Sequence, residues 1–380
     1  MNTKEIGEIR RRQRRDRSNM TAVYGCYVNE NKEIISEFKQ SVSMMPENEA
    51  EKYFALLRRT LGGTLGRNLI DVTFQTSQVA DSQEHKLLMA LRNSKLADEE
   101  ARAEFYKKAI DTLSLGANYL ILLGCDSYDV PFKSKDGDSQ ADNSDEVYTY
   151  VLCAICPVKQ TKATLHYVPE EKQFHDGNMV NVVSAPELGF LFPAFDNRAT
   201  NIYNALYFNK SAKENHEAFA DAIFHAPIPQ PAHQQKQSFE ALLTRSLEEE
   251  CSLEVVQTVH DQICQQIEMH KESKIPEALM LNKEQVKSIL EECGVNQQHL
   301  AKFSVDYDEA FGFEAQVHPK NIIDHKKIEL HTPDVIIKVA PDRSDLIETR
   351  VIDGVKYILI NADEDVTVNG VSIHIGDEEA

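Results

Sequence analysis

Six arginines lie close together near the start of the chain, and their type and spacing suit phosphate binding. They are Arg10, Arg11, Arg12, Arg14, Arg15 and Arg17. A guanidinium group donates paired hydrogen bonds to a phosphate, so several in one short segment can neutralise several phosphates. No aromatic residue is interleaved with them for stacking on bases. The pattern therefore predicts contact with a nucleic-acid backbone rather than with its sequence.

The charge of this segment is opposite to the charge of the rest of the chain. Residues 1–17 carry a net charge of +4, whereas the whole chain carries −20. A cationic segment on an anionic protein is suited to contact something negative. Three partners remain open: RNA, for example in the ribosome; an acidic surface of another protein; and the acidic body of the same chain.

A second group of polar residues lies inside an apolar, aromatic stretch at 192–204. Its members are Asp196, Arg198, Asn201 and Tyr203. Polar groups set among apolar residues can orient a ligand in an apolar cleft, which makes this stretch a candidate enzyme pocket. The alternative is an internal hydrogen-bond network with a buried Asp–Arg pair.

The other motifs predict no chemistry. Cys153 and Cys156 have C-x-x-C spacing, but they lie in an apolar run that reads as a strand, where positions i and i+3 face opposite ways. His216-Glu217 lacks the second histidine of a zinc motif. The acidic stretch 136–146 lacks the spacing of a calcium loop and reads as a surface loop. We expect no metal and no cofactor, and no catalytic residue can be assigned.

The elements that must position these residues predict a mixed α+β protein. Strands are expected near 21–27, 33–38, 68–74, 118–124, 147–158 and 164–168, and helices near 3–16, 47–61, 82–93 and 98–113. In the first helix only Ile6 and Ile9 are apolar, so we expect either a loose arm or a helix held by charge. Asp353-Gly354 and Asn369-Gly370 each predict a tight β-hairpin.

These elements predict five parts along the chain. They are a basic arm (1–19), a mixed α/β domain (20–226), a Pro/Gln-rich linker (227–237), a helical segment (238–330), and a C-terminal antiparallel β-module with two hairpins and an acidic tail (331–380). The β-module is expected to pack on the helices before it.

The sequence lacks the features of secreted and membrane-spanning proteins. No apolar run follows the basic N-terminus as in a signal peptide, and none approaches the length of a membrane span. The seven cysteines are odd in number and scattered, as in a protein of a reducing compartment. We expect a cytoplasmic protein that does not enter the membrane.

Several stretches also resemble a known family. They are Lys4–Arg12, Gly25–Ile35, Gly66–Asp71, Ile155–Lys159, Phe192–Asp196 and Thr349–Gly354. The chain resembles a family of proteins from anaerobic Gram-positive bacteria that is catalogued only as a domain of unknown function. The resemblance implies a bacterial cytoplasmic protein and supplies no activity, cofactor or catalytic residue.

Three functions remain open at this point. The first, which we favour, is a non-enzymatic interaction protein that docks an anionic partner through its basic arm. The second is an enzyme with a pocket around Asp196–Tyr203. The third is a structural or oligomeric protein whose arm closes on its own acidic surface.

Overall fold

The computed structural model describes residues 1–133, 139–140, 147–211, 213–362 and 366–373. The expected acidic loop (Asp136, Asp138, Asp142, Asp145, Glu146) and the acidic tail at 376–380 lie outside these residues. The chain forms two compact units. Unit 1 comprises residues 1–234 and 276–278, and unit 2 comprises residues 235–275 and 279–380.

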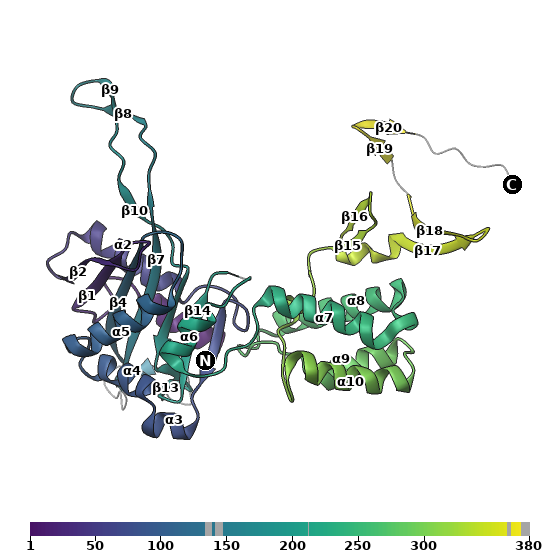
Figure 1. Ribbon diagram of the computed structural model, residues 1–380, viewed down its shortest axis with the longest axis horizontal. Helices are drawn as coiled ribbons and strands as arrows, with labels where there is room; N and C mark the ends of the chain where they lie inside the picture. Colours follow the sequence, from purple (N-terminus) through teal and green to yellow (C-terminus); the bar gives the residue numbers. More distant parts are fainter. Residues whose placement is uncertain (134–138, 141–146, 212, 363–365, 374–380) are drawn as a thin grey trace. The chain divides into compact units, whose positions relative to one another are not determined.

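Unit 1 is built on one antiparallel sheet in the order β2-β1-β4-β7-β11-β14-β3, with β10 paired to β7 (Figure 1). The strands are β1 (Ala22–Val28), β2 (Ile34–Ser41), β3 (Leu69–Thr73), β4 (Tyr119–Asp129), β7 (Val147–Gln160), β10 (Asn181–Val183), β11 (Leu188–Phe192) and β14 (Asn204–Asn209). Three small pairs accompany it: β5 (Phe132–Lys133) with β6 (Ser139–Gln140), β8 (Leu165–Val168) with β9 (Gln173–Asp176), and β12 (Ala194–Asp196) with β13 (Ala199–Asn201).

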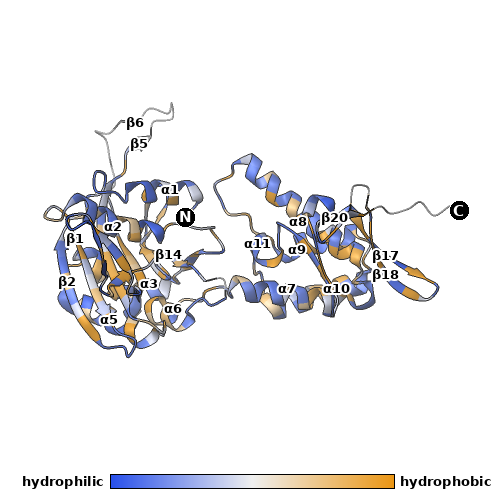
Figure 2. Cartoon of the chain, turned by 90° about the horizontal axis from the view of Figure 1, so that it is seen from above, coloured by the Kyte–Doolittle hydropathy of each residue, from blue (hydrophilic) through white to orange (hydrophobic). Residues whose placement is uncertain are grey.

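Helices cover both faces of this sheet. Side chains of α4 (Gln83–Asn93), α5 (Glu99–Thr112) and α6 (Glu217–Phe224) pack with one face. Those of α1 (Thr3–Arg12) and α2 (Glu47–Arg59) pack with the other. Successive residues of a strand point to opposite faces, and both faces are buried here. The central strands are therefore nearly all hydrophobic, as Figure 2 shows in orange. A short helix, α3 (Thr76–Asp81), precedes α4.

The first helix belongs to this fold. The sequence suggests that Ile6 and Ile9 cannot bury α1 well, but both side chains lie in the core under the sheet, Ile9 with 0% of its surface exposed. The expectation of a loose arm is therefore wrong, because two isoleucines one turn apart on one helix face both reach the core. Charged contacts also hold the helix, as the other alternative expects.

Unit 2 begins with helices packed around a separate apolar core. They are α7 (Ala232–Leu247), η1 (Glu248–Glu250), α8 (Leu253–Ser273), α9 (Lys283–Glu292), α10 (Gln297–Phe311) and α11 (Pro319–Ile322). Helix α7 takes up the last six residues of the stretch 227–237, in which the sequence suggests a linker. Alanine, glutamine and lysine favour a helix, and Pro231 stands directly before its first residue.

Three hairpins follow, rather than two. They are β15 (Ile328–His331) with β16 (Ile336–Val339), β17 (Ile347–Ile352) with β18 (Val355–Ile360), and β19 (Val366–Val368) with β20 (Val371–Ile373). Both Asp-Gly and Asn-Gly turns have the expected positive φ. The first hairpin lacks that signal, because its turn contains Pro333-Asp334. Between hairpins, η2 (Pro341–Leu346) contacts α8, where Ser344 donates a hydrogen bond to Asp261 at 2.8 Å.

The mixed α+β class predicted from the sequence is confirmed. Within the described part of the chain, no helix combines the length and the apolar character needed to cross a bilayer.

Candidate functional site

The N-terminal segment (residues 1–19) and the stretch 196–204 meet at one place in unit 1. The segment contacts this place through helix α1, whose N-terminus is capped. Asn2 caps α1 by accepting hydrogen bonds from the backbone N–H groups of Lys4 and Glu5, and the Glu5 side chain accepts one from the N–H of Asn2. This reciprocal arrangement fixes the direction in which residue 1 leaves the helix.

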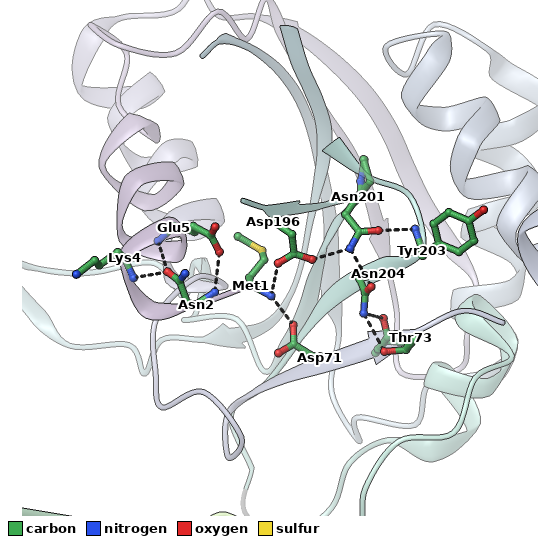
Figure 3. Close-up of polar contacts among 12 residues, drawn as sticks. Met1, Asn2, Lys4, Glu5, Asp71, Thr73, Asp196, Asn201, Tyr203 and Asn204 are labelled. Carbon is green, nitrogen blue, oxygen red and sulfur yellow. Dashed lines mark hydrogen bonds and ion pairs between the residues drawn. The ribbon is translucent and has the colours of Figure 1, made fainter. Parts of the chain in front are cut away.

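The ammonium group of Met1 lies between two carboxylates (Figure 3). Its nitrogen is 2.6 Å from Asp196 Oδ1 and 3.2 Å from Asp71 Oδ1. Burial opposes the charged amine, but the two carboxylates outweigh it and raise the pKa of this group above its ordinary value of 8.0. Burial also raises the pKa of the Asp71 carboxyl, although the ammonium opposes that shift.

Amide side chains hold Asp196 in place. Asn201 Nδ2 donates to Asp196 Oδ2 at 2.6 Å and to Asn204 Oδ1 at 3.0 Å. Asn204 in turn donates to Thr73 Oγ1 at 2.8 Å. Tyr203 contributes only its backbone N–H, which donates to Asn201, and its ring points away from the network (Figure 3).

A second contact joins the middle of α1 to the β12–β13 turn. Arg198 Nη1 donates to both oxygens of Glu8 at 2.7 and 2.8 Å, and Tyr128 donates its hydroxyl proton to the same carboxylate at 2.6 Å. Burial and this hydrogen bond raise the pKa of Tyr128 to about 12. Arg198 has φ of +61° in a two-residue turn, a position where glycine is favoured. Such strain is tolerated where the side chain has a task, which here is to bind Glu8.

A third contact ties the end of the segment to the buried carboxylate of Asp126. Gln13 donates to the hydroxyl of Tyr150 at 2.7 Å, and that hydroxyl donates to Asp126 Oδ2 at 2.9 Å. The backbone N–H of Asn19 donates to the other Asp126 oxygen at 2.7 Å. Burial raises the pKa of Asp126, while the charge of Arg12 opposes the shift. Arg12 also lies 4.1 Å above the ring of Tyr128.

The six arginines therefore fall into two groups. Arg12 is directed into the contact just described, and Arg15 is half-buried. The remaining four are exposed, and we call them the arginine cluster: Arg10, Arg11, Arg14 and Arg17. Only one carboxylate is found near their side chains in the described residues, that of Asp16, 3.7 Å from Arg17 Nε.

The N-terminal segment and the stretch 196–204, which the sequence gives no reason to group, lie together in the structure. Asp196 and Asn201 are joined by a hydrogen bond, and Asp196 also binds the Met1 ammonium. Arg198 pairs instead with Glu8, so the contacts of the described residues contain no Asp196–Arg198 pair. Sequence reasoning missed three acidic residues of this site: Glu8, Asp71 and Asp126. No local pattern marks them, because the contacts that tie Asp71 and Asp126 to the N-terminal segment, and Glu8 to Arg198, span 70 to 190 positions.

Three of the cysteine thiols are poorly suited to act as nucleophiles. Cys153 and Cys156 are in the cores on opposite faces of the sheet, as their spacing predicts, and burial raises the pKa of each thiol. In unit 2, Cys264 lies 3.8 Å from His260 Nδ1, but burial and Asp261 raise its pKa to about 11. A thiol with that pKa is protonated at neutral pH and weakly nucleophilic. Among the described residues, no group of three His, Cys, Asp or Glu side chains could hold a metal.

Fold and site define a mixed α+β protein whose first helix is docked on its own central sheet. The profile of a family described as a domain of unknown function (DUF4317) matches residues 1–371, and the chain belongs to this family. No curated protein is similar enough to the chain to count as a match.

The Met1 ammonium makes docking of α1 sensitive to alkali. Because its pKa is raised on folding, its contribution is complete below pH 8 and is lost as the pH rises through the raised value. We expect local opening of α1 to increase roughly twofold to fivefold between pH 7 and pH 10. Hydrogen exchange of the α1 amides, corrected for intrinsic rates, measures it. Protein acetylated at the α-amine should lack this step, and an equal step in both forms would contradict the assignment.

Proposed function

We propose that this protein is a non-enzymatic interaction protein that binds the phosphate backbone of RNA through its arginine cluster. The observation that supports this most is that the N-terminal segment docks through one set of side chains and exposes another set to solvent. Ile6, Ile9 and Glu5 are buried and Glu8 is half-buried, whereas Arg10, Arg11, Arg14 and Arg17 are exposed to solvent.

A docked segment is better suited to this role than a loose arm. Fixing the backbone in advance removes the entropy that a disordered arm would lose on binding. Met1, Glu8 and Gln13 supply that fixation through contacts that leave the four arginines free to bind phosphate.

The anionic body sets limits on the interaction. A net charge of −20 repels RNA at long range, so only a partner that reaches the cluster closely gains from it. We therefore expect a localised contact of about four phosphates rather than wrapping of RNA around the protein.

The test replaces all four arginines of the cluster with glutamine. Deleting residues 1–17 would be less informative, because it also removes Ile6, Ile9 and Glu8 from the fold. We expect the wild-type protein to sediment with RNA-containing particles in a lysate at low salt and the variant to remain at the top of the gradient. With purified RNA, the slope of log K against log salt should fall by about 3.

A matched control changes the net charge equally elsewhere. Lys107, Lys274, Lys326 and Lys356 are exposed lysines outside the segment, and their replacement with glutamine should leave binding within about twofold of wild type. Equal loss in both variants would reduce the effect to net charge, and no binding by the wild type would refute the proposal.

We also propose that the protein acts in the cytoplasm of a bacterium. RNA contact fits a bacterial cytoplasm, which the family resemblance implies. The seven cysteines are consistent with this, because all are free thiols and three of them are buried.

A further inference from the structure

Strand β2 forms one edge of the central sheet (Figure 1). No other strand in the described part of the chain pairs with its outer side. Most residues of β2 are exposed, among them Ile34 and Ile35, which are 47% and 51% exposed. The opposite edge strand, β3, is shorter and largely buried. An exposed edge strand as long as β2 is a template on which a further strand can pair.

The register of β2 with β1 shows which backbone groups β2 presents outward. Val42 donates its backbone N–H to the carbonyl group of Thr21, in line with the register of the two strands. In an antiparallel ladder, hydrogen-bonded and non-hydrogen-bonded residue pairs alternate, so every second residue of β2 bonds to β1. Glu37 and Lys39 belong to the other set. Their N–H and C=O groups therefore point away from β1, where an added strand can bond to them.

The side chains of Glu37 and Lys39 are also available. Both are exposed, and neither forms an ion pair with another described residue. Lys39 Nζ lies 5.4 Å from the centre of the Tyr24 ring. The two side chains share one face of β2, and Phe38, which lies between them in the sequence, is on the other face. Their opposite charges leave β2 without net charge, although the chain as a whole carries −20.

These charges select one register in which β2 is complementary to itself. A twofold axis through Phe38 places Glu37 opposite the partner's Lys39, and Lys39 opposite the partner's Glu37. The outward backbone groups of the same residues then face each other and form about four hydrogen bonds between the copies. Two opposite-charge pairs stand directly opposed, which favours pairing. Moving the axis to Glu37 or to Lys39 would instead oppose like charges.

We infer that β2 is a homodimer contact, in which the strands of two copies pair antiparallel about Phe38 and join the two sheets into one. The self-complementary charge pattern is what favours a second copy over an unrelated chain. Each copy carries −20, so the local attraction between β2 strands works against repulsion between the rest of the two chains. We therefore expect a reversible dimer that is sensitive to the two charges of β2.

The experiment reverses these charges one at a time and then together. Sedimentation velocity of the full chain, free of RNA, measures dimerisation over a concentration series at a fixed ionic strength of about 0.15 M. Glu37→Lys opposes lysine to lysine, and Lys39→Glu opposes glutamate to glutamate, so each should weaken dimerisation at least about tenfold. The double variant restores opposite charges and should dimerise within about threefold of wild type.

Mixing the two single variants gives the sharpest result. One variant then presents two lysines and the other two glutamates, so we expect a heterodimer although neither variant dimerises well alone. Repulsion between whole chains cannot produce this pattern. Glu37→Lys makes the chain less anionic, and by repulsion alone its dimer would be tighter than that of the wild type.

A matched control places the same charge change elsewhere. Glu170 is exposed in the turn between β8 and β9, and Glu170→Lys should leave dimerisation within about twofold of wild type. The changed side chains are exposed, so the melting temperature should stay near the wild-type value in every variant. The arginine cluster is intact in all of them, so this inference and the RNA proposal can fail independently.

Four outcomes would overturn the inference. They are a wild-type protein that stays monomeric at every concentration, which would leave the edge of β2 to a different chain; a dimer that persists unchanged in both single variants; single variants that remain monomeric when mixed; and equal weakening by Glu37→Lys and Glu170→Lys.

Discussion

Replacing Ile9 with alanine is expected to release the N-terminal helix from the sheet. Ile9 is fully buried and is one of two isoleucines through which α1 enters the core. Its truncation should cost about 2–4 kcal/mol, because the groove beneath the helix cannot collapse around the smaller side chain. We therefore expect trypsin to cleave between Arg10 and Arg17 at least about thirtyfold faster than in the wild type.

A matched substitution on the same helix separates undocking from a change in helix propensity. Lys4 is exposed, and Lys4→Ala should leave cleavage in residues 10–17 within about twofold of wild type. Equal rates in the two variants would mean that Ile9 does not hold the segment. If Ile9→Ala releases the segment, its RNA affinity should also fall, because the arginine cluster is then no longer pre-ordered.

Replacing Gly189 with alanine should have the largest effect on the stability of unit 1. Gly189 lies in the central strand β11, paired with Ala154 of β7. A Cβ atom there would lie 2.2 Å from the carbonyl oxygen of Cys153 and 2.8 Å from Thr60 Cγ2. Backbone in the middle of a sheet cannot move aside, so we expect a loss of about 3 kcal/mol or more, measured by thermal unfolding.

Gly124 provides the comparison. It also lies in a central strand, but its added Cβ would meet the side chains of Met20 and Leu57, at 2.5 Å and 2.9 Å. The flexible end of Met20 can adjust, so Gly124→Ala should cost clearly less than Gly189→Ala. The reverse order would show that the close approach of β11 to β7 is not what requires glycine at position 189.

Local patterns were sufficient for most elements. The apolar run at Tyr119–Gly124, the periodicity of Ala50, Phe54 and Leu57, and the capping residues Asn2 and Glu5 each predict the element that forms there. These signals succeed because propensity, capping and burial depend on residues a few positions apart. Helix α3 was missed, since its sequence has no apolar periodicity and buries no side chain.

The candidate site could be predicted only in part. The sequence marked Asp196, Arg198, Asn201 and Tyr203 as a candidate pocket, with an internal hydrogen-bond network as the alternative, and it identified the arginines as an unusual basic segment. It could not show that the two belong together, because ion pairs such as Glu8 with Arg198 depend on how β12 and β13 are placed under α1. Nor could it separate Arg12, directed inward, from the four exposed arginines.

By itself, then, the sequence determined the mixed α+β class, most of the strands and helices, and the charge contrast between the N-terminus and the rest. The tertiary structure decided that the N-terminal segment is docked and that Glu8, Gln13 and the Met1 amine make the contacts. The physical reason is the separation along the sequence of the residues that interact. Secondary structure follows from neighbours along the chain, whereas pairing of buried charges and exposure of a face depend on distant residues brought together by folding.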